Sequence, residues 1–194
     1  SGTVTLASDK AGILGDSGDV EITSGDARNG NSGSLRVSTG EGSKQAGDIS
    51  FMVGKSHGGV GSDISFFAGN SSYQSASGGN ITMVGGSTLA GYGSGGSVVL
   101  NGGEAKSSAG GSVVLMSGES SRSTSGDVIL MTANSTVGMT GSIKIVGGTS
   151  LNSLGGSVFI RSGGSGIVAG GDLDFASGSG YRTSSGNVRI GSAK

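Results

Sequence analysis

The sequence predicts an all-β protein, and within that class a β-solenoid of about thirteen coils of roughly 15 residues each. The first observation is a repeat: variants of the phrase Gly-(Asp/Ser/Asn)-Val-x-Leu-x-Ser-Gly recur thirteen times in 194 residues. The second is that apolar and polar residues alternate within each phrase, a pattern typical of short strands. The third is that Gly, 44 residues in all, interrupts every repeat. Because Gly costs about 1 kcal/mol relative to Ala inside a helix, helices are not expected.

Each phrase contains two apolar residues separated by one residue, and we call this segment the V-x-L phrase. Successive phrases begin about 15 residues apart, and the spacing is constant from Val98 to the end. A fixed short period indicates that one small structural unit is repeated. The thirteen apolar pairs are Val4/Leu6, Val20/Ile22, Leu35/Val37, Ile49/Phe51, Ile64/Phe66, Ile81/Met83, Val98/Leu100, Val113/Leu115, Val128/Leu130, Ile143/Ile145, Val158/Ile160, Leu173/Phe175 and Val188/Ile190.

Two β architectures fit this frame. In a solenoid each repeat is one coil, and equivalent strands stack in parallel about 4.8 Å apart. In an antiparallel meander, sandwich or barrel, each repeat is one strand followed by a loop. Hairpin loops are usually two to five residues long and rich in Asn-Gly or Asp-Gly, whereas intervals such as 102–110 are longer and resemble one another. Matching loops are what stacked coils require, so the solenoid is the favoured prediction.

The coil predicted from one repeat has a thin core. The two apolar residues of the V-x-L phrase face inward, and the opposite side offers mainly Ser, Ala and Gly. Gly allows two backbones to approach closely. The residue after the leading Gly of each phrase is of a type that hydrogen-bonds to its own backbone at turns, so this row is expected to fix the corner of each coil. The row is Asp19, Ser34, Asp48, Asp63, Asn80, Ser97, Ser112, Asp127, Ser142, Ser157, Asp172 and Asn187.

The outward positions of the central phrases are apolar, whereas those of the terminal phrases are polar. The apolar area of such a patch is larger than the area that single, scattered apolar residues expose on a protein surface. The patch therefore indicates a buried contact, either within the chain or with another copy. We call these residues the assembly face: Met52, Phe67, Val84, Val99, Val114, Met116, Ile129, Met131 and Val146.

The composition limits the partners. The formal net charge is −1, there is no Cys, and no apolar run approaches the roughly 18 residues of a membrane-spanning helix. We therefore expect neither nucleic acid nor membrane insertion, and we expect self-association. No linker or change of composition divides the chain, so 1–194 is predicted to be a single repeat domain. We expect it to be a segment of a longer array.

No recognised catalytic or metal-binding constellation is present. His57 is the only histidine, and Gly91–Gly95 resembles a phosphate-binding loop but lacks a following helix. The Asp residues lack the spacing of the known calcium repeat. We therefore expect no enzyme activity, cofactor or metal. Three sequons, at Asn70, Asn80 and Asn134, are acceptors for N-linked glycans if the protein is secreted.

The units Ser125–Leu130 and Gly110–Leu115 resemble the Gly/Ser-rich repeat segments of large, mostly uncharacterised secreted or surface proteins of algae and other protists. This resemblance covers the whole chain, implies an extracellular structural context, and supplies no catalytic residues. The resulting prediction is a structural protein that assembles into a rod or filament through exposed strand edges and the assembly face. Thirteen stacked coils would give a rod of about 60 Å.

An ice-binding or a carbohydrate-adhesive solenoid is the alternative function. Ice binding would use Thr rows, of which only the pair Thr3 and Thr5 is present. Adhesion would use aromatic stacking, for which Tyr73, Tyr92 and Tyr181 are available.

Overall fold

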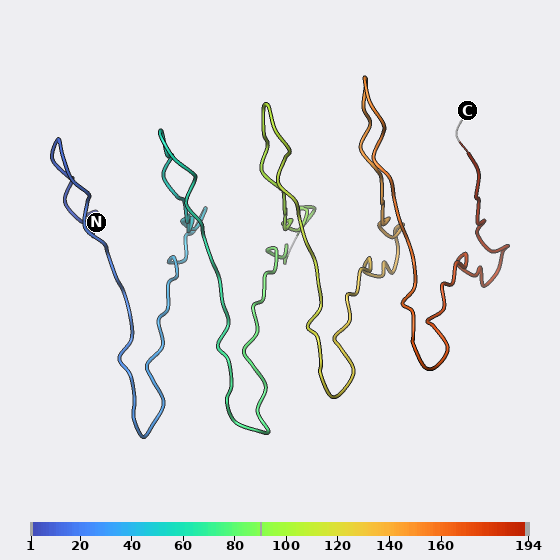
Figure 1. The fold of residues 1–194 in the computed structure, drawn as a ribbon, viewed down its shortest axis with the longest axis horizontal. Helices are drawn as coiled ribbons and strands as arrows, with labels where there is room; N and C mark the ends of the chain where they lie inside the picture. The colour runs from blue at the N-terminus through green and yellow to red at the C-terminus, as the bar shows by residue number, and fades with distance from the viewer. Residues whose placement is uncertain (1, 90, 193–194) are drawn as a thin grey trace. The chain divides into compact units, whose positions relative to one another are not determined.

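The computed structural model describes residues 2–89 and 91–192, and this part of the chain contains neither a helix nor a β-strand (Figure 1). The predicted β-solenoid is therefore wrong. The alternative of an antiparallel meander, sandwich or barrel is wrong for the same reason, because each of these requires strands. The chain is rich in coil, and its regularity lies in a repeated loop.

Backbone hydrogen bonds within the repeats explain the difference. In seven intervals between V-x-L phrases, the N–H of the Gly at the end of the interval donates to the C=O of a Gly at its start, at N···O distances of 2.8–3.0 Å. These bonds close loops within the chain and do not join neighbouring phrases into a ladder. We call the bonded pair of Gly residues the neck of the loop. The necks are Gly69/Gly79, Gly86/Gly96, Gly103/Gly111, Gly118/Gly126, Gly148/Gly156, Gly163/Gly171 and Gly178/Gly186.

Each loop turns back at a bend midway between two phrases, which we call the tip (Figure 1). Five of the closed loops span nine residues, as in 103–111, and the loops 69–79 and 86–96 span eleven. These two longer loops fill the two longest intervals between phrases, from Ile64 to Ile81 and from Ile81 to Val98, so the loop absorbs the variation in repeat length. The tips lie at 13–15, 28–30, 43–44, 57–59, 73–75, 91–92, 106–108, 121–123, 136–138, 151–153, 166–168 and 181–183.

Small residues at the neck allow the two arms of a loop to approach closely. A Cβ built on Gly102 would collide with the carbonyl oxygen of Gly111, and one built on Gly126 would lie 3.5 Å from the Cβ of Ser117. The residues that are partly buried in the described part of the chain all occupy one repeat position, four residues after the first apolar residue of the phrase. They are Ala68, Gly85, Ser117, Gly147, Ser162 and Ser177.

The predicted thin core is absent from the described residues, none of which is buried. The accessible surface is 20192 Å². A folded monomer of this mass would expose about 8,200 Å², and its extended chain about 26,800 Å². The chain thus retains roughly three quarters of the extended surface.

Contacts between Cα atoms divide the chain into two units, Ser1–Val98 and Val99–Lys194. The division falls inside the phrase Val98-Val99-Leu100 and does not coincide with a Gly/Ser-rich interval. Both units contain the same kind of loop, closed by Gly–Gly hydrogen bonds. The organisation of 1–194 as one repeat domain stays a prediction.

We expect the substitution Gly102→Ala to open the loop 103–111. Its methyl group would collide with the carbonyl of Gly111, and the displaced arm would lose the bond from Gly111 N to Gly103 O. A net loss of about 1 kcal/mol corresponds to roughly fivefold faster amide exchange at Gly111. Gly103→Ala is the matched control, because nothing lies within 4 Å of its Cβ position. Equal exchange rates in the two variants would contradict this account of the neck.

Candidate interaction surface

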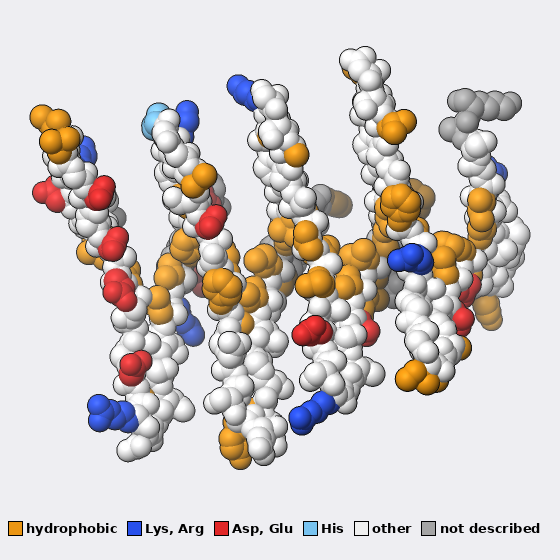
Figure 2. Space-filling view, viewed as in Figure 1, with side chains coloured by type: hydrophobic (Ala, Val, Ile, Leu, Met, Phe, Trp, Pro, Cys, Tyr) orange, Lys and Arg blue, Asp and Glu red, His pale blue; other side chains and the backbone are white. Residues whose placement is uncertain are grey.

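The V-x-L phrases leave their apolar side chains open to solvent. Between the second and the last phrase, the first apolar residue of each pair is 47% (Ile49) to 64% (Leu35) exposed. The residues of the assembly face are more exposed, from 70% at Ile129 to 90% at Phe67. Hydrophobic side chains are accordingly visible on the surface of both units (Figure 2). Because the described residues form no core, no contact within this part of the chain buries the assembly face.

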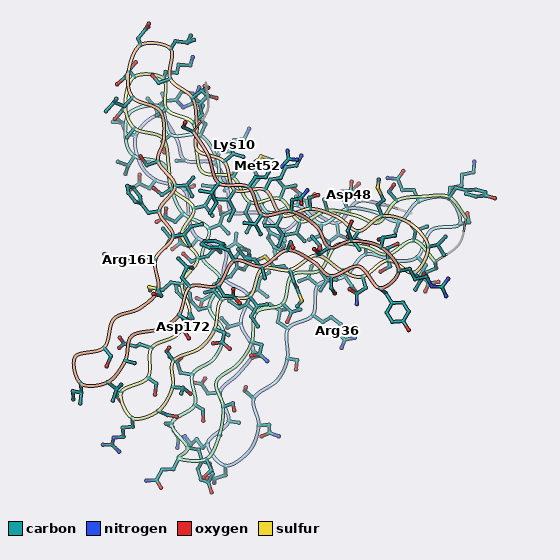
Figure 3. All side chains as sticks on the ribbon, turned by 90° about the vertical axis from the view of Figure 1, so that its right-hand side faces the viewer. Lys10, Arg36, Asp48, Met52, Arg161 and Asp172 are labelled. Carbon is teal, nitrogen blue, oxygen red and sulfur yellow. The ribbon has the colours of Figure 1, made fainter. Side chains whose placement is uncertain are left out.

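The assembly face occupies two positions of the repeat, both on the segments between loop necks. Val99, Val114 and Ile129 stand between the paired residues of their phrases, and the other six members directly follow the second paired residue. Met52, labelled in Figure 3, follows Phe51 and belongs to the same repeat as the labelled Asp48. Met52, Phe67 and Val84 belong to the first unit and the rest to the second. Each unit therefore presents its own part of the face.

A second set of exposed apolar residues lies in the loops, and the sequence analysis missed it. From the sequence these intervals are Ser-rich connections, and the alternation that selects outward apolar residues is confined to the V-x-L phrases. The signal that could have revealed the set is an apolar residue about halfway between two phrases. The set comprises Ile13, Leu14, Val60, Leu89, Val137, Met139, Leu151, Leu154, Ile167 and Val168, beside the loop tyrosines Tyr73, Tyr92 and Tyr181 already named above.

Serine side chains shape several tips. Ser120 Oγ accepts hydrogen bonds from the backbone N–H groups of Arg122 (3.4 Å) and Ser123 (3.0 Å). Ser135, Ser150 and Ser165 stand at the same repeat position, and each accepts a bond from a backbone N–H three residues later. These are local side-chain turns of the kind that Ser favours.

The expected role of the Asp/Ser/Asn row that follows the leading Gly is wrong. In the described part of the chain, no side chain of that row takes part in a side-chain hydrogen bond. The serine at the tip provides the turn hydrogen bond in its place. Thr88 stabilises a longer loop differently, since its Oγ1 donates to the carbonyl oxygen of Ser94 at 2.9 Å.

The described residues contain no group of three or more His, Asp or Glu side chains that could hold a metal ion. His57 lies in the tip 57–59 and is exposed. One hollow of about 620 Å³ is lined by Phe159, Ile160 and Arg161. Phe159 is 92% exposed, so the hollow is open to solvent. Its three consecutive lining residues would not shield a bound ligand from water.

The three sequons are exposed. Asn70 follows the neck residue Gly69, and Asn80 follows the neck residue Gly79. Asn134 precedes Ser135, the serine that accepts the hydrogen bond from Gly138 N. Their glycosylation stays a prediction. The described residues contain no helical segment with the length and hydropathy of a membrane span.

No protein-family model, no curated protein and no solved structure matches the chain. The resemblance to repeat segments of secreted and surface proteins therefore stays a prediction, as does the extracellular location that it implies.

We expect Ser120→Ala to loosen the tip 121–123, because two backbone N–H groups lose their acceptor. A local turn bond of this kind contributes about 0.5–1 kcal/mol, so trypsin should cleave after Arg122 roughly two to five times faster. The control is Ser121→Ala, since Ser121 lies in the same tip but accepts neither of these bonds. Identical cleavage rates for Ser120→Ala and the unmodified chain would show that the serine does not order the tip.

Proposed function

We propose that this chain is a structural repeat protein whose function is to self-associate into a rod or filament through its apolar assembly face. The observation that carries the proposal is the combination of repeated apolar phrases with the absence of any buried residue in the described part of the chain. An extracellular or cell-surface location is part of the proposal and rests on the resemblance of the repeats. Strand edges are not part of it, because the described residues form no strand.

The free-energy balance of the isolated chain supports association. Ordering the backbone costs about 1–2 kcal/mol per residue, and burial of apolar surface is the main term that offsets this cost, at about 25 cal/mol per Å². A chain that keeps roughly three quarters of its extended surface exposed gains little free energy from the burial of apolar surface. A second copy that covers the assembly face supplies the missing burial.

The repeat itself favours copies of the same chain as the partner. The V-x-L phrase recurs thirteen times, so one copy offers the same kind of surface at many positions, and another copy can match it repeat to repeat. The net charge of −1 means that little electrostatic repulsion opposes contact between copies. Partial matches leave repeats uncovered and available to further copies, which leads from dimers to extended assemblies.

The double variant Val99→Lys and Val114→Lys tests the assembly face. Each apolar side chain that association buries contributes about 1.5–3 kcal/mol, so the pair should weaken association by at least a hundredfold. Sedimentation velocity over a range of protein concentrations measures this change.

Ser50→Lys and Ser65→Lys form the matched control for this variant. Ser50 and Ser65 stand at the same repeat position as Val99 and Val114, are also exposed, and receive the same added charge. We expect the control to associate within a few-fold of the unmodified chain. Equal loss in both double variants would assign the effect to charge and overturn the role of the assembly face.

We also expect ordering to depend on concentration. If copies supply the burial that one chain lacks, amide protection at the loop necks should increase as the protein associates. Hydrogen exchange of Gly111, Gly126 and Gly156, measured in dilute and concentrated samples, checks this, and the Val99/Val114 double variant should show no increase. Protection that is full in a strictly monomeric sample would argue against a structure completed by assembly.

A further inference from the structure

Four loops carry an acidic residue at their start and a basic residue at the tip, and two of them, 103–111 and 118–126, are closed by a neck hydrogen bond. In each of the four, Asp or Glu directly follows the Gly that begins the loop, and Lys or Arg follows two or three residues later, inside the bend. We call these the dipolar loops: 25–33 with Asp26 and Arg28, 40–47 with Glu41 and Lys44, 103–111 with Glu104 and Lys106, and 118–126 with Glu119 and Arg122.

None of the twelve tips of the described chain contains Asp or Glu, and five contain Lys or Arg. The five are the tips of the four dipolar loops and the tip 181–183, which holds Arg182. Basic side chains are visible at the ends of loops in both units (Figure 2). These five tips are therefore positive, and the other seven contain no Asp, Glu, Lys or Arg, although the chain as a whole carries a net charge of −1.

The loop 118–126 shows how these charges are presented. Its neck is closed by the bond from Gly126 N to Gly118 O at 3.0 Å, and carboxylates flank it on both sides, with Glu119 after one Gly and Asp127 after the other. Ser120 fixes the bend that holds Arg122. The side chains of Glu119, Arg122 and Asp127 are exposed and take part in no side-chain hydrogen bond among the described residues.

We propose that the dipolar loops dock reciprocally with the same loops of a second copy of this chain, the tip cation of each copy lying against the acidic side chain at the start of the loop in the other. The inference rests on the proposed function and specifies how two copies are aligned. Such a contact is self-complementary, as the interface of a symmetric pair requires. In the loop 118–126 the Arg at the tip also suits the paired carboxylates Glu119 and Asp127 of a second copy, because its guanidinium donates several hydrogen bonds from one plane.

Charge complementarity identifies the second copy as the partner. An anionic polymer would be attracted by Arg122 but repelled by Glu119 and Asp127 at the neck of the same loop. A second copy of the loop satisfies both signs at once. Exposed ion pairs contribute little individually, about 0–1 kcal/mol, so the loops set alignment while the assembly face supplies most of the affinity.

A swap variant tests the docking and changes the net charge only from −1 to +1, because two carboxylates are removed and the eight other changes cancel. It combines Asp26→Lys, Glu41→Lys, Glu104→Lys and Glu119→Lys with Arg28→Glu, Lys44→Glu, Lys106→Glu and Arg122→Glu. It also carries Asp48→Ser and Asp127→Ser, so that no original carboxylate meets the new acidic tips; Ser already stands at this position in the other two dipolar loops, at Ser34 and Ser112. We expect the swap variant to self-associate like the unmodified chain, since its loops are still complementary to one another. Mixed with the unmodified chain, its tips and necks meet like charges, so energy transfer between fluorescently labelled copies should be at least tenfold lower than in either pure sample.

The ionic strength provides a second readout. In 1 M NaCl the Debye length falls to about 3 Å, so the swap variant and the unmodified chain should then mix freely, while association through the assembly face persists. Free mixing already at low salt, or failure of the swap variant to self-associate, would overturn reciprocal docking and leave the proposed function standing. Absence of association by the unmodified chain at any salt concentration would overturn both.

Discussion

The hydrogen bond between two Gly residues at the loop neck is the interaction on which the rest of the structure depends. It closes an interval of nine or eleven residues within the chain itself, as between Gly103 and Gly111. The close approach of the two arms explains why Gly or another small residue occupies the positions around the neck, since a Cβ on Gly102 would meet the backbone of the opposite arm. With the neck closed, the tip and the V-x-L phrase become separate surfaces. The tip exposes charged or apolar residues, and the V-x-L phrase exposes the assembly face.

The sequence predicts the repeat frame well, because the frame depends on local chemistry. Gly pairs, small residues and serines recur at fixed offsets, and the structure uses them for necks and tips, as at Gly118, Gly126 and Ser120. The architecture could not be predicted in the same way. A phrase such as Val113-Val114-Leu115 has the alternation of a strand, but a strand exists only where a neighbouring segment accepts its hydrogen bonds. That pairing joins residues distant in sequence, and no residue type within a single repeat specifies it.

The same distinction applies to the candidate site. Alternation along the chain selects Val114 and Met116 as outward residues; both are exposed in the structure, but so are their paired neighbours Val113 and Leu115, so the assembly face stays a prediction. Alternation was not enough to find Leu151, Leu154 or Ile167, which stand outside the V-x-L phrases and become conspicuous only when their intervals are seen to project as loops. The charge pattern of Glu119 and Arg122 likewise acquires meaning from the loop, because the neck and the tip place the two charges at different distances from the phrase.

Apolar and charged residues have different consequences for an assembly of repeats. Burial of Val99, Val114 or Met116 is non-directional, and any phrase can cover any other with nearly the same gain. Thirteen similar phrases therefore permit many alignments, and affinity alone would give irregular aggregates. The dipolar loops are not uniformly distributed: they lie at 25–33 and 40–47, and again at 103–111 and 118–126. Because only a few alignments bring all of these loops together, weak ion pairs are sufficient to select among alignments that the apolar phrases leave nearly equal. Unequal repeats thus convert a general tendency to associate into a defined assembly.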